Sequence, residues 1–206
     1  MKKNIFLFDI DGTLTKSRNK IEPFMENFLL EISKTHDIGA IGGSDYPKAK
    51  EQLGDSIKLF KWVFTENGLV SFKDSEKFHS RRITDYLGED RQTEFINFLL
   101  RYLSQLDIPK KRGTFIEYRT GMFNVSPIGR NCSQQERDEF DEYNKTAKVL
   151  EKMKGDVEKE FGEKFGMIFS IGGQISFDCM PKGWDKSYCL QFIEKEYENI
   201  YFLQNC

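Results

Sequence analysis

Residues 4–15 read Asn4-Ile-Phe-Leu-Phe-Asp9-Ile-Asp11-Gly-Thr-Leu-Thr15. The apolar run predicts a buried strand that ends on two aspartates placed one residue apart. Because residues i and i+2 of an extended segment point the same way, Asp9 and Asp11 are expected to face one volume beyond the strand. Open α/β sheets bind their ligands at that carboxyl edge. Two carboxylates there repel each other unless a cation lies between them, and their oxygens suit Mg²⁺.

This aspartate pair has the chemistry needed for phosphoryl transfer. Asp9 can attack phosphorus to give an aspartyl-phosphate while Asp11 moves a proton. Gly12 permits a sharp turn, and Thr13 can hydrogen-bond the phosphate or the loop. A solvated turn is the alternative interpretation; a calcium loop is excluded, because no third acid and no closing glutamate follow at the required spacing. The stretch resembles the D-x-D-G-T nucleophile loop of the haloacid dehalogenase (HAD) phosphotransferases.

The composition excludes several other classes of function. The 206 residues include 31 basic and 33 acidic side chains, so no net field draws the chain to nucleic acid or to a membrane. His36 and His79 are the only histidines, which argues against an imidazole-rich metal site. Four cysteines form no C-x-x-C pair, as is typical of reduced thiols in a cytosolic protein. No stretch approaches the roughly 18 apolar residues of a membrane span, so we expect a soluble, cytoplasmic protein.

The coarse pattern along the chain changes twice. The first part alternates helices and strands in the manner of a parallel α/β unit: helix 21–35, strand 38–41, helix 47–53, strand 62–64, then an Asn67-Gly68 hairpin signal. The middle part reads as antiparallel strands with helices: helix 95–106, strands 114–119 and 123–126, a helix capped by Ser133-x-x-Glu136, helix 147–165, and strands 169–171 and 175–178. The last part returns to the first pattern, with a helix after Trp184 and a strand over 199–203 that we expect to be parallel and buried.

These changes predict an α/β protein with two domains. Residues 1–81 and 183–206 are expected to form a Rossmannoid core with a parallel sheet, and residues 82–182 an inserted α+β cap with an antiparallel sheet and helices.

Further candidates for phosphate binding lie outside the first loop. Ser44 ends the second core strand on a glycine-rich turn, and Lys186 lies at a helix start where its ammonium group can neutralise the nucleophile and the phosphate. Arg119, Arg130 and Arg137 lie in a short span of the middle domain, and guanidinium groups bind phosphate oxygens bidentately. From spacing alone, ordinary turn and surface residues remain the alternative for all five.

Longer motifs narrow the resemblance to the eukaryotic phosphomannomutase family of the HAD superfamily. The motifs are 9–18 with Arg18, Gly42-Gly43-Ser44-Asp45, Glu66-Asn67-Gly68-Leu69-Val70, 112–130, Glu136-Arg137, 169–178 and 181–190. Together they cover almost the whole chain.

The resemblance implies interconversion of mannose 6-phosphate and mannose 1-phosphate, for GDP-mannose synthesis and protein N-glycosylation. It implies Asp9 as nucleophile and Asp11 as general acid/base, with Mg²⁺ held at Asp9 and at the backbone of Asp11. It further implies hexose phosphates as substrates, a hexose bisphosphate activator, and a homodimer formed through the cap. The substrate-binding positions that match are Arg18, Arg119, Arg130, Arg137, Ser176 and Asp178.

One departure from the family pattern bears on activity. The family continues after the strand that matches 200–203 with a Gly-Asp-Lys-Thr loop whose aspartate completes the metal site, whereas here Asn205 stands at that position. We therefore expect a truncated or catalytically impaired chain as the alternative, or a non-catalytic relative that binds sugar phosphates. A HAD sugar-phosphate phosphatase is a further alternative.

Overall fold

The computed structural model describes residues 2–16 and 19–205, which divide into two compact units. Unit 1 comprises residues 1–81 and 183–206, and unit 2 comprises residues 82–182. Arg18, one of the residues expected to bind substrate, lies outside the described residues.

Unit 1 is built on a six-stranded sheet with the order β10-β1-β2-β3-β4-β5. Its elements are β1 (Lys2–Asp9), α1 (Pro23–Ser33), β2 (Asp37–Ile41), α2 (Tyr46–Leu53), η1 (Gly54–Leu59), β3 (Trp62–Thr65), η2 (Glu66–Gly68), β4 (Val70–Lys73), β5 (Glu76–Ser80), η3 (Lys186–Cys189), α6 (Leu190–Ile193) and β10 (Tyr197–Leu203). Strands β10, β1, β2 and β3 run parallel, and β4 and β5 complete the sheet with antiparallel pairing. The expected parallel α/β core is confirmed.

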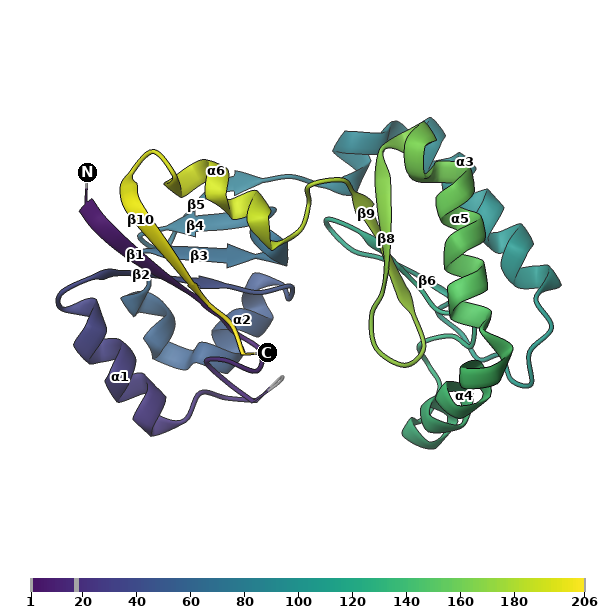
Figure 1. The fold of residues 1–206 in the computed structure, drawn as a ribbon, viewed down its shortest axis with the longest axis horizontal. Coiled ribbons are helices and arrows are strands. Elements are labelled where there is room, and N and C mark those ends of the chain that lie inside the picture. The colour runs from purple at the N-terminus through teal and green to yellow at the C-terminus, as the bar shows by residue number, and fades with distance from the viewer. Residues whose placement is uncertain (1, 17–18, 206) are drawn as a thin grey trace. The chain divides into compact units, whose positions relative to one another are not determined.

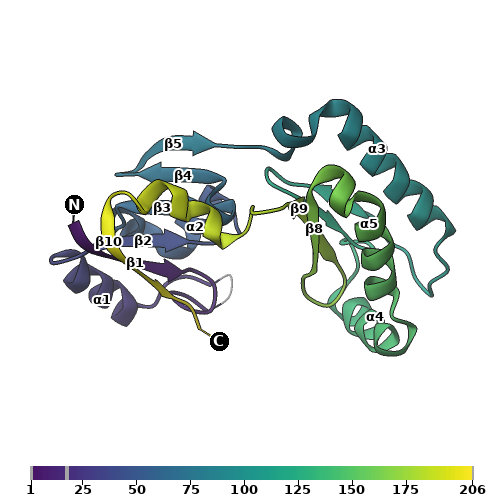
Figure 2. The same cartoon turned by 45° about the horizontal axis from the view of Figure 1, so that its top comes forward.

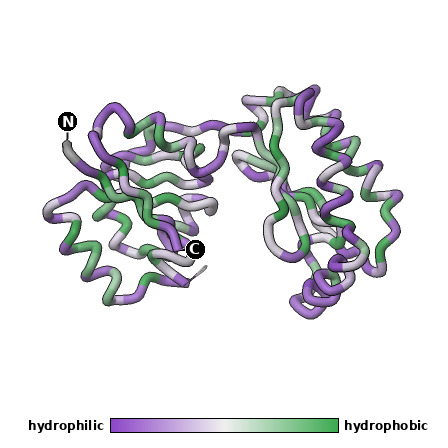
Figure 3. The backbone as a smooth tube through the Cα atoms, viewed as in Figure 1, coloured by the Kyte–Doolittle hydropathy of each residue, from purple (hydrophilic) through white to green (hydrophobic). Residues whose placement is uncertain are grey.

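The period of two along β1 explains why both faces of this sheet are covered. Ile5 and Leu7 join one buried cluster with Ile193 of α6, while Phe8 joins another with Leu29 of α1. Accordingly, α1 and α2 lie on one side of the sheet and α6 on the other (Figure 1). Figure 3 shows hydrophobic residues gathered along these strands. The two clusters hold the carboxyl end of β1 in place.

The expectation of a buried last strand was wrong. Strand β10 is parallel to β1, as expected, but it lies at the edge of the sheet, and Tyr201, Phe202 and Leu203 are exposed. An edge strand with one neighbour covers only part of its side chains, whereas the apolar composition alone suggested cover on both faces.

The amino end of β10 is tied to the sheet by a buried polar cluster. The Tyr197 hydroxyl donates to Asp37 Oδ2 over 2.7 Å and accepts from Trp62 Nε1 over 3.1 Å. Lys61 Nζ lies 3.0 Å from the same Asp37 oxygen. Burial and the hydrogen bond to Asp37 raise the pKa of Tyr197, so its hydroxyl stays protonated and keeps donating.

Unit 2 is an antiparallel four-stranded sheet with the order β6-β7-β9-β8, covered by helices (Figure 2). Its elements are α3 (Ile83–Gln105), β6 (Ile116–Tyr118), β7 (Phe123–Val125), α4 (Gln134–Ala147), α5 (Val149–Phe165), β8 (Met167–Ile171) and β9 (Phe177–Pro181). The expected α+β architecture is confirmed, but some bounds differ. Helix α3 begins at Ile83 and not at 95, with non-helical backbone at Gly88, and the last strand covers 177–181 and not 175–178, so Ser176 precedes it.

One face of the unit 2 sheet is apolar and packs on helices. The Phe95 ring of α3 lies 5.4 Å from that of Phe123 in β7 and 5.1 Å from that of Phe161 in α5. Because side chains alternate along a strand, residues such as Asn124 and Asp178 point to the opposite face. That face carries the polar residues that the sequence singled out.

No helix among the described residues has the length and apolar character needed to cross a membrane.

Candidate active site

The first candidate site is the tight loop that follows β1. Asp9 is the last residue of the strand and only 5% exposed, whereas Asp11 is partly buried. Backbone hydrogen bonds close the loop: Gly12 N–H donates to the carbonyl of Thr15 over 2.7 Å, and Thr15 N–H to that of Ile10 over 3.0 Å. Gly12 has φ +83°, a conformation that residues with a side chain rarely adopt, so the turn requires glycine here.

Lys186 meets Asp9 directly. Its Nζ lies 2.8 Å from Asp9 Oδ2, and this cation approaches from the other end of the chain. The Asp185 carboxylate caps the turn η3 by accepting from Ser187 N–H over 2.8 Å, which fixes the first turn on which Lys186 stands. The structure therefore brings two of the predicted phosphoryl-transfer residues into one ion pair.

Gln52 is a neighbour of Asp11 that sequence reasoning missed. Its Nε2 donates to Asp11 Oδ1 over 2.9 Å and to Thr15 Oγ1 over 3.1 Å, and the residue is 1% exposed. Gln52 lies in the last turn of α2, where a glutamine reads as an ordinary surface residue, so no local signal marked it.

Ser44 lies in the loop after β2, at the same sheet edge as Asp9. The register pairs Asp9 with Ile41, the last residue of β2, and Ser44 follows three residues later. Its carbonyl accepts from Glu66 N–H over 2.9 Å. The sheet thus places the Ser44 loop beside the Asp9 loop, as the motif order suggested.

A second candidate site lies on the polar face of the unit 2 sheet. Cross-strand pairing places Glu117, Asn124, Asp178 and Ser170 in one row across β6, β7, β9 and β8. We call this row, with the side chains bonded to it, the polar face.

Hydrogen bonds join five of the expected substrate-binding residues on this face. Arg119 Nη2 donates to Glu117 Oε2 over 2.6 Å, and Arg130 Nε lies 3.2 Å from the same oxygen. Arg137 Nη2 donates to the Arg130 carbonyl over 3.2 Å.

The central amide of the polar face completes the network. Asn124 Oδ1 accepts from Arg130 Nη1 over 2.6 Å, and Nδ2 donates to Asp178 Oδ1 over 2.7 Å and to Ser176 Oγ over 3.1 Å. Glu117 and Asn124 were missed, because each occupies an alternating strand position that reads as solvent-facing.

The electrostatics of this face suit an anion. Burial is the main cause that lowers the pKa of Arg130; Glu117 opposes the shift, and the nearby Arg119 and Arg137 add to it. The guanidinium stays charged, and three arginines within one network favour binding of a phosphate dianion. Arg137 lies in the first turn of α4, whose Ser133–Glu136 capping box is confirmed.

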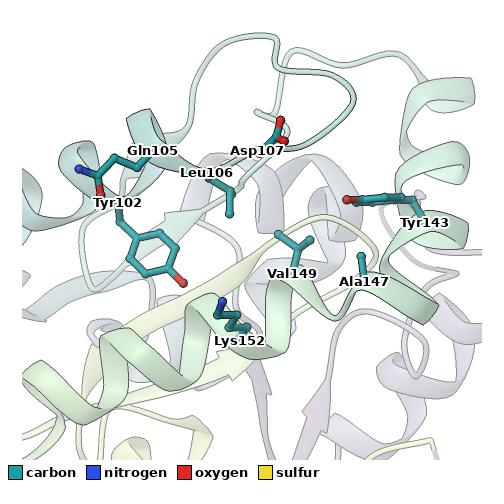
Figure 4. A pocket seen from close by; sticks show the side chains of 8 residues that line it. All are labelled: Tyr102, Gln105, Leu106, Asp107, Tyr143, Ala147, Val149 and Lys152. Carbon is teal, nitrogen blue, oxygen red and sulfur yellow. The ribbon is translucent and has the colours of Figure 1, made fainter.

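A cavity of about 400 Å³ elsewhere in unit 2 is a separate feature (Figure 4). It is lined by Tyr102, Gln105, Leu106, Asp107, Tyr143, Ala147, Val149 and Lys152. None of the described residues expected to bind substrate or phosphate is among them.

The Asp9 loop offers the ligand type that Mg²⁺ requires. Two carboxylates follow one strand end, and hard oxygen ligands suit this ion. Within 2–16 and 19–205, no group of three or more histidine, cysteine, aspartate or glutamate residues is arranged to hold a metal. Asp9 and Asp11 are thus the two described residues of this loop whose oxygens are of the type that Mg²⁺ prefers, and they are the residues that would hold the ion.

Comparison with known proteins identifies the family. The family profile described as "Eukaryotic phosphomannomutase" matches residues 25–206. Phosphomannomutase 1 of Dictyostelium discoideum is 52% identical over 200 residues, which cover 96% of this chain and 80% of that protein. The phosphomannomutase of Solanum lycopersicum is 51% identical over 199 residues, which cover 96% of this chain and 78% of the relative.

A solved structure agrees at the level of fold. A haloacid dehalogenase-like hydrolase from Bacteroides thetaiotaomicron has a TM-score of 0.56 at 14% identity, over 94% of this chain and 77% of that chain. At this identity the likeness concerns the fold alone. The family profile and the relatives, which match nearly the whole chain, decide the matter: this chain belongs to the eukaryotic phosphomannomutase family.

Proposed function

We propose that this chain interconverts mannose 6-phosphate and mannose 1-phosphate through an aspartyl-phosphate on Asp9. The observation that carries the proposal is sequence identity: about half of the residues are identical to those of phosphomannomutases, along 96% of the chain. The buried Asp9 beside Lys186, at the carboxyl end of β1, supplies the matching chemistry.

In the first half-reaction, Asp9 attacks phosphorus of a hexose bisphosphate and the bond from phosphorus to the sugar oxygen breaks. Asp11 gives its proton to that leaving oxygen. In the second, Asp11 takes the proton from the hydroxyl of a hexose monophosphate as that oxygen attacks the phosphorus of the aspartyl-phosphate. The bisphosphate is regenerated and the nucleophile is free again, so no net phosphate is consumed.

Several groups of unit 1 support these steps. Lys186 stabilises the Asp9 carboxylate and the charge of the transferring phosphoryl group. Ser44 is proposed to hydrogen-bond phosphoryl oxygens from the neighbouring loop. Mg²⁺ held by Asp9 and Asp11 would neutralise further charge on the phosphoryl oxygens.

Unit 2 is proposed to recognise the rest of the substrate. Arg119, Arg130 and Arg137 bind the phosphate that does not react, and Ser176 and Asp178 hydrogen-bond sugar hydroxyls. By the same resemblance, Arg18 is proposed as a further substrate contact.

The wider setting follows from the family. We propose a cytoplasmic enzyme that supplies mannose 1-phosphate for GDP-mannose and N-glycosylation, consistent with free thiols at Cys132, Cys179 and Cys189. A homodimer formed through unit 2 is proposed as well, and analytical ultracentrifugation of the full chain tests it.

A coupled assay tests the proposed reaction. Mannose 1-phosphate is supplied with a hexose 1,6-bisphosphate and Mg²⁺, and both mannose 6-phosphate and free phosphate are measured. Formation of mannose 6-phosphate, abolished by Asp9→Asn, is expected. Release of free phosphate alone would identify a sugar-phosphate phosphatase, and binding without turnover a non-catalytic relative.

A further inference from the structure

Asn124 lies at the centre of the polar face without reaching solvent. It is 3% exposed in β7 and stands in register between Glu117 of β6 and Asp178 of β9. Its three side-chain hydrogen bonds all go to residues proposed to bind substrate, namely Arg130, Ser176 and Asp178. A side chain so buried acts on a ligand through its neighbours.

The partners of Asn124 fix the orientation of its amide. Oδ1 faces the guanidinium of Arg130, which can only donate, and Nδ2 faces the carboxylate of Asp178, which accepts. A flipped amide would place two donors together at Arg130 and two acceptors together at Asp178. Only a side chain with an acceptor on one side and a donor on the other satisfies both neighbours.

The second oxygen of Asp178 lies beside Gly172. A Cβ added to Gly172 would lie only 3.2 Å from Asp178 Oδ2, so the absence of a side chain there leaves room for the carboxylate. The Gly172 carbonyl also accepts from Ser176 Oγ over 3.2 Å. The carboxylate therefore has the Asn124 amide bonded to one oxygen and Gly172 beside the other, and the hydrogen bond from Asn124 orients it.

We propose that Asn124 is a positioning residue that fixes Arg130 and Asp178 relative to each other, and so contributes to discrimination between hexose epimers. This inference rests on the proposed function. The physical reason is that one amide joins a phosphate-binding cation to a group that bonds sugar hydroxyls. Epimers carry the same phosphate and differ in the placement of one hydroxyl, so selectivity requires a fixed spacing between the two recognition points.

Two substitutions test the hydrogen bonds at the two ends of the Asn124 amide. Asn124→Asp keeps an acceptor for Arg130 but places an oxygen against Asp178 Oδ1, where like charges repel. Asn124→Leu has a similar size and removes both hydrogen bonds. The matched control is Ser126→Ala, because Ser126 directly follows the same strand, is fully buried, and its hydroxyl bonds only to backbone groups, at Ile175 and Gly129.

The experiment measures binding and turnover on the full chain. Calorimetry gives the dissociation constants of inorganic phosphate, mannose 1-phosphate and glucose 1-phosphate, and the coupled assay gives kcat/KM for both sugars. Asn124→Asp is expected to lower the mannose-to-glucose preference about tenfold and to change phosphate binding little. Asn124→Leu is expected to weaken binding of both phosphate and sugar phosphates, about tenfold or more for mannose 1-phosphate. Ser126→Ala is expected to lower the melting temperature without changing the preference.

The outcomes separate this inference from the proposed function. An unchanged preference in Asn124→Asp, within about twofold of the wild type and of the control, overturns the positioning role. If Asn124→Leu does not fold, Asn124→Asp alone decides. A wild-type chain that binds hexose phosphates without turnover contradicts the proposed reaction, while the binding constants still test Asn124. A wild-type chain that binds neither sugar phosphate overturns both.

Discussion

At the scale of single residues, the ion pair of Asp9 and Lys186 is the contact that bears most directly on Asp9 as the proposed nucleophile. The Asp9 side chain is 7% exposed and that of Lys186 33% exposed, with 2.8 Å between the charged atoms. A carboxylate this buried needs a cation nearby, since an unpaired buried charge is strongly destabilising.

Lys186→Met should therefore reduce turnover by at least about 100-fold, because it removes the cation that stabilises both Asp9 and the transferring phosphoryl group. Lys186→Arg should recover part of the activity. The measurement is the coupled assay together with the amount of phosphorylated protein after mixing with bisphosphate. Lys195→Met, which removes an exposed lysine, is the control. Turnover of Lys186→Met within about threefold of the control would contradict the role of the pair.

Gln52 gives a second prediction at this scale. Gln52→Leu removes the donor that orients Asp11 and leaves an apolar side chain of similar size in the same site. Oε1 of Gln52 is buried without a hydrogen-bond partner among the described residues. Removing this oxygen should therefore change the free energy of unfolding little. We expect kcat to fall about tenfold while KM and the melting temperature change less.

The control for Gln52 is Ser56→Ala, since Ser56 is buried nearby and bonds to Glu26 instead of the Asp9 loop. Equal losses in KM and in melting temperature for Gln52→Leu would indicate a structural role only.

Site residues could be predicted from the sequence where they belong to a recognisable motif. Asp9 and Lys186 were predicted as parts of one site, and the structure pairs them. Gln52 and Asn124 were not, because their importance comes from partners far away in the chain, and no local pattern distinguishes them from surface residues of a helix or strand.

At the scale of elements, two glycines illustrate how backbone conformation and free space decide the effect of an added side chain. Gly129 precedes Arg130, has φ +91°, and would place a Cβ 2.5 Å from the carbonyl oxygen of Gly113. Gly155 lies within α5 and would place its Cβ in open space.

Gly129→Ala should lower the free energy of unfolding by at least about 2 kcal/mol, because it combines a strained φ with a clash against backbone. It should also weaken phosphate binding by displacing Arg130. Gly155→Ala should instead raise the free energy of unfolding by about 0.5–1 kcal/mol through lower backbone entropy of the unfolded chain. Urea unfolding of both variants checks the opposite signs, and equal signs would contradict the assignment.

The cap of α4 predicts a dependence on pH. The hydrogen bond from Arg112, and secondly that from the Ser133 amide, lower the pKa of Glu136 from 4.5 to about 2. Since the pKa is lower in the folded state, the stabilisation is present above about pH 4.5 and is lost as the pH falls toward 2. Glu136→Gln should therefore lower stability near pH 7, and the difference from wild type should narrow toward about pH 2.

Urea unfolding across this pH range measures the effect of Glu136→Gln. Glu142→Gln is the control, because Glu142 lies on the same helix in a highly exposed ion pair with Lys145, and such pairs contribute little. A difference that stays constant with pH would show that the capping hydrogen bonds act independently of charge.

Elements could be predicted where the chain carries a start signal or a clear period. The capping box at Ser133 located α4. The strand β5 was missed, since it follows a turn formed by Asp74 and Ser75, both with positive φ, where the sequence has no glycine. The exposure of β10 was missed as well, because sheet order is a tertiary property that an apolar run does not encode.

At the scale of the whole molecule, the residues proposed for phosphoryl transfer and those proposed for binding the distal phosphate lie in different units. Asp9, Asp11 and Lys186 belong to unit 1, and the arginines of the polar face belong to unit 2. The change in the sequence from a parallel to an antiparallel pattern near residue 82 predicted these two units. The hydrogen bonds within the polar face could not be predicted from the sequence, because the register between strands distant in the chain brings the bonded residues together.

Metal removal should therefore separate the two chemistries. Chelation of Mg²⁺ is expected to abolish transfer, because Asp9 and Asp11 then repel each other and the phosphoryl charge loses its partner. Binding of inorganic phosphate by the polar face should persist, since its guanidinium groups need no metal.

Arg130→Gln should produce the reverse pattern, with phosphate binding weakened about tenfold or more and the Mg²⁺ concentration for half-maximal activity unchanged. Calorimetry with and without chelator, and Mg²⁺ titration of turnover in both proteins, measure this. Loss of phosphate binding on chelation would show instead that the anion binds at the Asp9 loop, and the polar face would then need another role.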